Sequence, residues 1–209
     1  MDIQNAHTHL NVYFNFLIIY IMSIWNNYNE TRPYLSNEME KHKIKQLTDF
    51  FSEYNINVAK FSALEVGAGH GIYTGILFNI FDKLIAIEPN TELYNKLTNR
   101  YAEKGVSTYN VSIEKFKTNK KFDTIIFMNV FLFVKNKQKV LVELATMIKS
   151  NKFLIIMEPF KFLKFDGQKH NIQKLMTDTV IFITKSKKFE LVYYGFILNG
   201  QICFILKKI

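Results

Sequence analysis

The amino-acid sequence predicts an α/β fold in which helices cover both faces of a mostly parallel sheet. Short, continuously apolar runs alternate with segments whose apolar residues recur at helical spacing, which is typical of parallel strands buried on both faces. A glycine-rich loop follows the first apolar run and precedes a helical segment. The last two strand-like segments are separated by Asn199-Gly200, a dipeptide that indicates a tight antiparallel hairpin.

The predicted elements follow one another with short connections. Ser36 or Asn37 is suited to cap a first helix, whose apolar positions extend to Tyr54. Asn90 is suited to cap a later helix, and Gly105 is suited to end it. The strands are expected at residues 61–66, 84–88, 106–110, 122–130, 153–158, 189–198 and 201–207. The remaining helices are expected at residues 72–81, 138–149 and about 168–187, where the helical spacing is weakest.

The chain is basic, but the distribution of its charge does not favour a nucleic-acid partner. It has 209 residues, of which 48% are hydrophobic, and a formal net charge of +9. Arginine is the residue best suited to bidentate contacts with phosphates and bases, and it occurs only at Arg32 and Arg100. The lysines are dispersed along the whole chain. The length fits one domain with one sizeable core.

The N-terminal segment at residues 10–25 is apolar and needs an interpretation of its own. Its unbroken apolar stretch, residues 16–22, is much shorter than the roughly 20 residues that a membrane-spanning helix needs. No Lys or Arg precedes it, so it lacks the basic start of a signal peptide. We expect residues 1–24 to form a surface extension and residues 25–209 to form a single domain. Membrane contact by this segment, and a translation start at Met22, are the alternatives.

The glycine-rich loop indicates the kind of ligand. Residues 64–72 have the sequence LEVGAGHGI, with glycines at Gly67, Gly69 and Gly71. Glycines let the chain turn sharply and let a ligand approach the backbone closely. A dinucleotide-binding loop would have its third glycine where Ile72 stands. The observed spacing, with Glu65 two residues before the first glycine, favours a ligand that has an ammonium and a carboxylate but no pyrophosphate.

Several segments resemble class I S-adenosylmethionine-dependent methyltransferases. Residues 63–71, ALEVGAGHG, are similar to the first motif of that family. Residues 85–90, IAIEPN, resemble its second strand, which ends in an acid, and residues 122–129, FDTIIFMN, resemble its fourth. The terminal hairpin resembles its reversed last strand. The resemblance covers roughly residues 25–209, and it implies a Rossmann-like sheet of seven strands in the order 3-2-1-4-5-7-6, with only strand 7 antiparallel.

The resemblance also implies S-adenosyl-L-methionine as the cofactor and assigns it a set of contacts. Glu88 follows the glycines by about 20 residues, which places its carboxylate at the ribose hydroxyls. We expect Glu88→Ala to weaken cofactor binding with little loss of stability. Glu65 is expected to support the glycine loop, to meet the methionine ammonium, or both. The loop residue Ala68 and the neighbour Pro89 belong to the same set.

The adenine ring is expected next to the segment Ser112, Ile113 and Glu114, where Ile113 would cover the ring face. The acid that the family uses there aligns with Ser112, and Glu114 follows two residues later. Asn129 ends the fourth strand, either near the methionine end of the cofactor or as a simple turn residue. Tyr28 and Arg32 precede the first helix and are expected either to contact the cofactor carboxylate or to pack at the surface.

The predicted function is methyl transfer to a small-molecule acceptor. Residues 129–132, NVFL, lack the Asn-Pro-Pro-aromatic motif of many amino methyltransferases that act on bases or glutamine. The acceptor is expected beneath the segment before the first helix and the insert at residues 158–170, which is rich in phenylalanine. The phenylalanines of this insert are Phe160, Phe162 and Phe165. Two other functions compete, a degenerate cofactor-binding partner subunit and a nicotinamide-dependent oxidoreductase, and Ile72 argues against the second.

No residue is assigned a catalytic role from the sequence. The methyl group of the cofactor is already activated, so proximity and orientation can provide most of the catalysis. His70 and His170 are candidate bases, but neither stands at metal-ligand spacing from other ligands, so no metal is expected. Cys203 is the only cysteine, which excludes an intrachain disulfide and favours a cytoplasmic protein.

Overall fold

The computed structural model describes residues 37–159, 164–165, 168–169, 182, 185–197 and 201–209. The helices are α2 (Asn37–Glu53), α3 (Ile72–Ile80), α4 (Thr91–Tyr101) and α5 (Lys137–Met147), with single 3₁₀ turns η1 (Val58–Lys60), η2 (Ala102–Lys104) and η3 (Phe131–Phe133). The main strands are β1 (Ser62–Val66), β2 (Lys83–Ile87), β3 (Ser107–Tyr109), β4 (Phe122–Met128), β5 (Ile148–Pro159), β8 (Phe189–Ile197) and β9 (Gln201–Lys208). Two short strands, β6 (Lys164–Phe165) and β7 (Gln168–Lys169), pair with each other.

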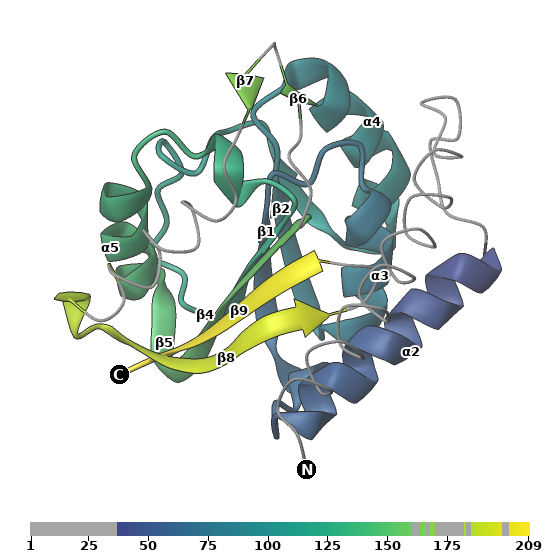
Figure 1. Cartoon of the computed structure of the whole chain (residues 1–209). Coiled ribbons are helices and arrows are strands. Elements are labelled where there is room, and N and C mark those ends of the chain that lie inside the picture. Colours follow the sequence, from purple (N-terminus) through teal and green to yellow (C-terminus); the bar gives the residue numbers. More distant parts are fainter. Residues whose placement is uncertain (1–36, 160–163, 166–167, 170–181, 183–184, 198–200) are drawn as a thin grey trace.

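The seven main strands form one sheet in the order β3-β2-β1-β4-β5-β9-β8 (Figure 1). Strands β1 to β5 pair in parallel, whereas β9 is antiparallel to both of its neighbours. Counted along the chain, β8 and β9 are the sixth and seventh strands of this sheet. The predicted order 3-2-1-4-5-7-6 with a reversed seventh strand is therefore confirmed.

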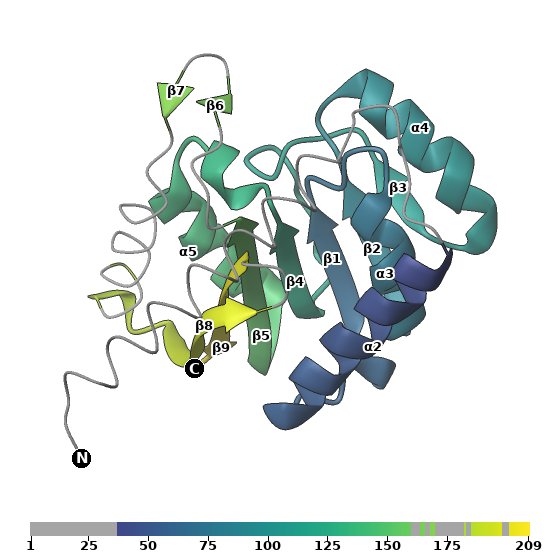
Figure 2. The same cartoon turned by 45° about the vertical axis from the view of Figure 1, so that its right-hand side comes forward.

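Helices cover both faces of the sheet, and each face has its own apolar core (Figure 2). The face covered by α5 includes Phe127, Leu144 and Phe204. The face covered by α2, α3 and α4 includes Phe51 and Ile76. All seven residues of β4 are buried, because this central strand has apolar neighbours on both sides.

The predicted helix caps are confirmed for α4, and its last turn shows how the helix ends. The Asn90 side chain accepts a hydrogen bond from the Leu93 N–H at 3.1 Å. The last turn tightens into η2, after which Gly105 adopts φ 92°. Ser36 and the Asn199-Gly200 dipeptide lie outside the described residues.

The start of β5 corrects one expectation. The helix α5 was expected to reach residue 149, but it ends at Met147, and Ile148 is already extended and opposite Phe122 in the sheet. Ile148 is fully buried, as its apolar character suggests, but it belongs to a strand and not to the expected helix. The polar residues that follow resemble a loop in the sequence. The strand accommodates them with a register shift and with Asn151 at φ 59°.

The weakly predicted helix at residues 168–187 is wrong at its beginning. Gln168 and Lys169 are instead extended and pair antiparallel with β6. Phe182, Lys185 and Ser186 are helical, in agreement with the expectation. The other residues of this segment lie outside the described part of the chain.

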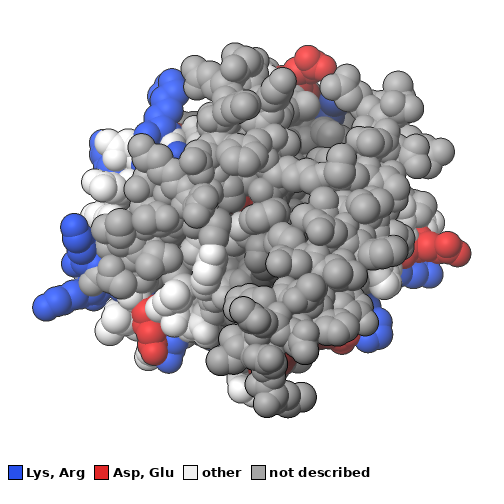
Figure 3. All heavy atoms as spheres, viewed as in Figure 1, with Lys and Arg blue, Asp and Glu red and all other residues white. Residues whose placement is uncertain are grey.

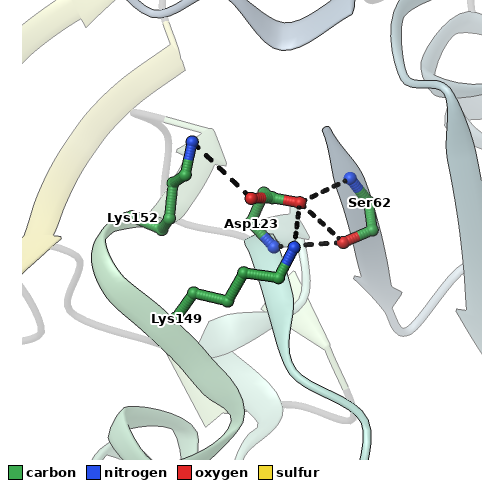
Figure 4. A network of polar contacts seen from close by, with 4 residues as sticks. All are labelled: Ser62, Asp123, Lys149 and Lys152. Carbon is green, nitrogen blue, oxygen red and sulfur yellow. Dashed lines mark hydrogen bonds and ion pairs between the residues drawn. The ribbon is translucent and has the colours of Figure 1, made fainter. Parts of the chain in front are cut away.

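A polar network holds the amino ends of three strands together (Figure 4). One carboxylate oxygen of Asp123 accepts hydrogen bonds from the Ser62 N–H at 3.0 Å and the Ser62 hydroxyl at 2.8 Å. The Lys149 ammonium lies 2.8 Å from the same oxygen, and Lys152 lies 3.6 Å from the other. Burial opposes ionisation of Asp123, but the hydrogen bonds from Lys149 and Ser62 outweigh it and lower its pKa to about 2.

The described part of the chain has no feature typical of a membrane span or a metal site. None of the helices described is long and apolar enough to span a membrane. Within the same residues, no three His, Cys, Asp or Glu side chains gather in a way that could hold a metal ion. Figure 3 shows described Lys and Arg side chains in several separate places around the rim of one face, in keeping with lysines dispersed along the sequence.

Candidate functional site

The candidate site lies at the carboxyl edge of the parallel strands, where β1 passes through the glycine loop into α3. Gly67, Gly69 and Gly71 all have positive φ, at 68°, 59° and 93°. Residues with a side chain adopt this region at a cost, which explains three glycines at alternate positions. The N–H groups of Gly67 and Ala68 both donate to the Ile87 carbonyl, at 2.8 and 3.1 Å, which ties the loop to the end of β2.

The three glycines differ in what surrounds them. A side chain at Gly67 would collide with Val130, and a Cβ at Gly71 would lie 2.5 Å from the Tyr101 ring. Among the described residues, a Cβ at Gly69 would have no atom within 4 Å. Gly67 and Gly71 are therefore needed for internal packing, whereas Gly69 faces open space that a ligand can enter.

Glu88 lies beside this open space and is not an exposed acid at a helix entry. It directly follows β2, and it is only 6% exposed. Its Oε2 accepts a hydrogen bond from the Gly69 N–H at 2.8 Å, and its Oε1 accepts one from the Asn90 N–H at 2.8 Å. The carboxylate predicted to hold the ribose thus also supports the glycine loop and the start of α4.

Asn110 is a residue of this edge that the sequence argument missed. Its Nδ2 donates to the carbonyls of Glu88 at 2.8 Å and Pro89 at 3.2 Å. Its Oδ1 lies 3.0 Å from the Thr91 hydroxyl. The side chain therefore braces the turn that carries Glu88, and the only signal in the sequence was its position directly after the third strand.

Glu65 lies within β1 and is 1% exposed. Its Oε2 accepts a hydrogen bond from the Thr74 hydroxyl in the first turn of α3, at 2.7 Å. Burial raises the pKa of Glu65 to about 8, the Thr74 bond opposes this rise, and the charge of Glu88 adds to it. This hydrogen bond links β1 to α3 across the glycine loop, and both expected roles of Glu65 stay predictions.

The segment predicted to bind adenine follows β3, next to the end of β2. Ile113 is buried against the core on the α5 side, and Ser112 accepts two backbone hydrogen bonds through its carbonyl. Glu114 accepts a hydrogen bond from the Lys135 N–H at 3.3 Å. Burial would raise the pKa of Glu114, but backbone hydrogen bonds and the Ser112 side chain outweigh burial and lower it.

Asn129 follows β4 and is the centre of a polar cluster formed with Tyr73 and Gln201. Its Nδ2 donates to the Tyr73 hydroxyl at 3.1 Å, and its Oδ1 accepts from the Gln201 Nε2 at 2.6 Å. The same Nε2 lies 3.5 Å from the Tyr73 hydroxyl. The sequence predicted only Asn129 here, because Tyr73 and Gln201 stand far from it along the chain.

Glu158 is a second buried acid at this edge, and no role was predicted for it. It is 1% exposed, and its Oε1 accepts hydrogen bonds from the backbone N–H groups of Phe131 at 2.5 Å and Leu132 at 3.3 Å. It thereby caps the 3₁₀ turn η3 that follows β4. Burial raises the pKa of Glu158 to about 8, against the opposing effect of these hydrogen bonds and of the Lys137 charge.

Other predicted residues of the site lie outside the described part of the chain. These are Tyr28, Arg32, Phe160, Phe162 and His170. Phe165 belongs to β6, but its side chain is not described. His70 is partly exposed on the glycine loop. Within the described part, the fold brings Glu65, the glycine loop, Glu88, residues 112–114 and Asn129 to one edge of the sheet.

Comparisons with known proteins agree with this geometry. A family model described as a methyltransferase domain matches residues 64–156. A search of curated proteins finds no match. The similar solved structures include the N-methyltransferase NodS from Bradyrhizobium japonicum WM9 in complex with S-adenosyl-l-homocysteine, with a TM-score of 0.62 and 14% identity. That comparison covers 83% of this chain and 89% of that chain.

Two further structures show the same fold at low sequence identity. CalS10, an amino pentose methyltransferase from Micromonospora echinaspora solved with bound SAM, has a TM-score of 0.63 and 12% identity, covering 81% of this chain and 92% of that chain. An S-adenosylmethionine-dependent methyltransferase from Clostridium acetobutylicum ATCC 824 has a TM-score of 0.61 and 13% identity, covering 94% of this chain and 99% of that chain. These likenesses concern the fold.

Proposed function

We propose that this chain is a class I S-adenosylmethionine-dependent methyltransferase that transfers a methyl group to a small-molecule acceptor. S-adenosyl-L-methionine is its proposed cofactor. The observation that carries the site assignment is the open space at Gly69 beside the Glu88 carboxylate, at the carboxyl edge of β1 and β2.

The residues at this edge fit the chemistry of the cofactor. Glu88 would accept hydrogen bonds from the ribose hydroxyls, since each carboxylate oxygen has room for a second donor. Ile113 and the residues beside it would border the adenine ring. Glu65 and the backbone of Gly67 would lie toward the methionine end. Tyr28 and Arg32 stay proposals from the sequence, because the structure does not describe them.

The chain's own contribution to the reaction is mainly placement. When bound, the cofactor would supply a methyl group on a positively charged sulfur, which makes the methyl carbon open to displacement by an acceptor's lone pair, with the sulfur as leaving group. The glycine loop and Glu88 would fix the donor, and Asn129 would lie where the acceptor approaches. An acceptor that carries a proton releases it after transfer, and no base is assigned to that step.

A small-molecule acceptor is supported by two observations. The residues after β4 lack the motif of many enzymes that methylate bases or glutamine. The named acceptor of CalS10 is an amino pentose, and NodS is an N-methyltransferase. A cytoplasmic location and the division into residues 1–24 and 25–209 stay predictions of the sequence.

The decisive experiment is calorimetric titration with S-adenosyl-L-homocysteine and with NAD. We expect the first to bind and to raise the melting temperature, because a ligand of the native state at about 100 times its Kd stabilises it by about 2.7 kcal/mol. Binding of NAD alone would instead identify a nicotinamide-dependent oxidoreductase. Cofactor binding without methyl transfer to any compound of a broad acceptor panel would favour a degenerate partner subunit.

A further inference from the structure

We infer that Tyr73, Asn129 and Gln201 bind the methyl acceptor. They select an acceptor that carries several hydroxyl groups and whose nucleophile is an amine or one of these hydroxyls. This inference rests on the proposed function, since it names the acceptor class for the same site. It starts from a convergence that no local pattern in the sequence indicates. Three elements, α3, the residue after β4, and the first residue of β9, each bring one polar side chain to the carboxyl edge.

The three side chains form one hydrogen-bonded set. Gln201 Nε2 donates to Asn129 Oδ1 at 2.6 Å, and Asn129 Nδ2 donates to the Tyr73 hydroxyl at 3.1 Å. All three residues are partly buried. Gln201 lies 72 residues from Asn129, Asn129 lies 56 residues from Tyr73, and Gln201 lies 128 residues from Tyr73. The order of the strands and the reversed last strand therefore create the cluster.

The backbone at Asn129 is held in an unusual conformation that directs its side chain into this cluster. Its φ is 61°, a region that non-glycine residues adopt at a cost and that often occurs at functional sites. Its N–H donates to the Met157 carbonyl at 2.7 Å, which fixes the turn against β5. The next residue, Val130, fills the space that Gly67 leaves. The cluster is therefore adjacent to the glycine loop, on the side of the expected methionine end.

The chemistry of the cluster favours a polar, neutral partner. Amide and phenol groups both donate and accept hydrogen bonds, as hydroxyl and amine groups do. The amide groups of Asn129 and Gln201 keep hydrogen-bonding capacity beyond the bonds within the set, and an apolar acceptor could not use that capacity when it displaced water. The Lys43 ammonium lies 5.3 Å from the centre of the Tyr73 ring, and burial lowers its pKa. While Lys43 carries its proton, its charge favours the neutral form of a bound amine, which is the form with a lone pair for the methyl carbon, and its lowered pKa means that burial works against that charge.

Two variants test the inference. Tyr73→Phe removes one oxygen atom. Asn129→Gly removes the side chain, and glycine adopts the positive φ without strain. Asn151→Gly is a matched control, because Asn151 has φ 59°, is exposed, and lies at the beginning of β5, away from the site.

The probes are D-glucosamine and indole. Saturation-transfer NMR measures their binding to protein that is saturated with S-adenosyl-L-homocysteine. We expect D-glucosamine to bind the wild type and indole not to bind. Affinity for D-glucosamine should fall at least tenfold in Tyr73→Phe and Asn129→Gly and stay unchanged in Asn151→Gly. The Kd for S-adenosyl-L-homocysteine, measured by calorimetry, should stay within twofold in Tyr73→Phe and Asn151→Gly.

Each other outcome contradicts the inference in a recognisable way. Binding of indole alone, of neither probe, or of D-glucosamine equally by wild type and variants would show that the cluster does not select the acceptor. Loss of S-adenosyl-L-homocysteine binding in the variants would assign the cluster to the cofactor. If the wild type does not bind S-adenosyl-L-homocysteine, the proposed function itself fails. If Asn129→Gly does not fold, Tyr73→Phe decides alone.

Discussion

At the scale of single residues, Glu88 supports the glycine loop and is also the residue proposed to hold the ribose. Its carboxylate accepts hydrogen bonds from the backbone N–H groups of Gly69 and Asn90, and its carbonyl accepts one from Asn110. A carboxylate can accept about four hydrogen bonds in total. Glu88 therefore holds the apo loop in shape and keeps capacity for two ribose hydroxyls.

The variant Glu88→Ala should lose both affinity and stability. We expect the Kd for S-adenosyl-L-homocysteine to rise by about one to two decades, and the free energy of unfolding to fall by roughly 1–3 kcal/mol. The second effect revises the expectation from the sequence, because the N–H groups of Gly69 and Asn90 lose a charged partner. Calorimetry and denaturant titration measure the two effects. Glu103→Ala, an exposed control, should change neither, and a wild-type Kd in Glu88→Ala would refute the ribose assignment.

The glycine loop supports a second prediction at the residue scale. Gly71→Ala should destabilise the fold clearly, because the new Cβ lies 2.5 Å from the Tyr101 ring. Gly69→Val should fold with a loss of about 1–2 kcal/mol from its positive φ alone, yet it should bind S-adenosyl-L-homocysteine at least tenfold more weakly, since the side chain enters the ligand space. Thermal melts and calorimetry compare the two. Equal cofactor affinity in Gly69→Val and the wild type would mean that this space is not the cofactor site.

At the scale of elements, β5 connects two edges of the sheet that serve different purposes. Its first residues bring Lys149 and Lys152 to Asp123 at the amino edge (Figure 4). Near its other end, Glu158 caps the turn after β4. The strand is longer than the sequence suggested, because it already begins at Ile148, which pairs with Phe122, and continues through a register shift to Phe153.

The variant Asp123→Asn separates stability from binding. We expect the free energy of unfolding to fall by about 1–3 kcal/mol, because the Ser62 and lysine donors lose a charged partner. This loss of unfolding free energy is modest because both lysines are partly exposed, so solvent and salt screen their charges. Calorimetry should give a wild-type Kd for S-adenosyl-L-homocysteine, since the network lies at the edge opposite the site. A large loss of affinity would contradict the separation of the two edges.

At the scale of the whole molecule, buried carboxyl groups with opposite pKa shifts determine how stability changes with pH. The pKa of Asp123 lies below its usual value, so its contribution is lost as pH falls from about 4 to about 2. Glu65 and Glu158 have a folded-state pKa of about 8, above the usual 4.5. The native state therefore binds more protons than the unfolded state between these values, and stability from these two groups is lost as pH rises from about 4.5 to about 8.

Denaturant titrations from pH 3 to pH 9 should show this profile in the cofactor-free protein. We expect a maximum near pH 4–5, with a decline of a few kcal/mol toward pH 8. Glu158→Gln keeps an oxygen that accepts the Phe131 and Leu132 N–H groups but cannot ionise, so its decline should be shallower. A wild type that gains stability between pH 5 and pH 8, or a variant with the wild-type slope, would contradict the assignment.

The sequence by itself determined the alternation of elements, the reversed last strand, the glycine loop and the acid after the second strand. These features depend on local patterns, such as continuous apolar runs, an Asn-Gly turn, and glycines where φ is positive. Its errors concern β5 and residues 168–169, where pairing with distant or reversed segments overrides local propensity.

Only the tertiary structure decided how the site is assembled. It distinguished Gly69, which faces open space, from Gly67 and Gly71, which are packed against Val130 and Tyr101. It brought Tyr73 and Gln201 to Asn129, and it placed Glu158 against the turn after β4. These contacts join residues that are tens of positions apart. The order of the strands decides which of them meet, so a pattern read along the chain cannot contain them.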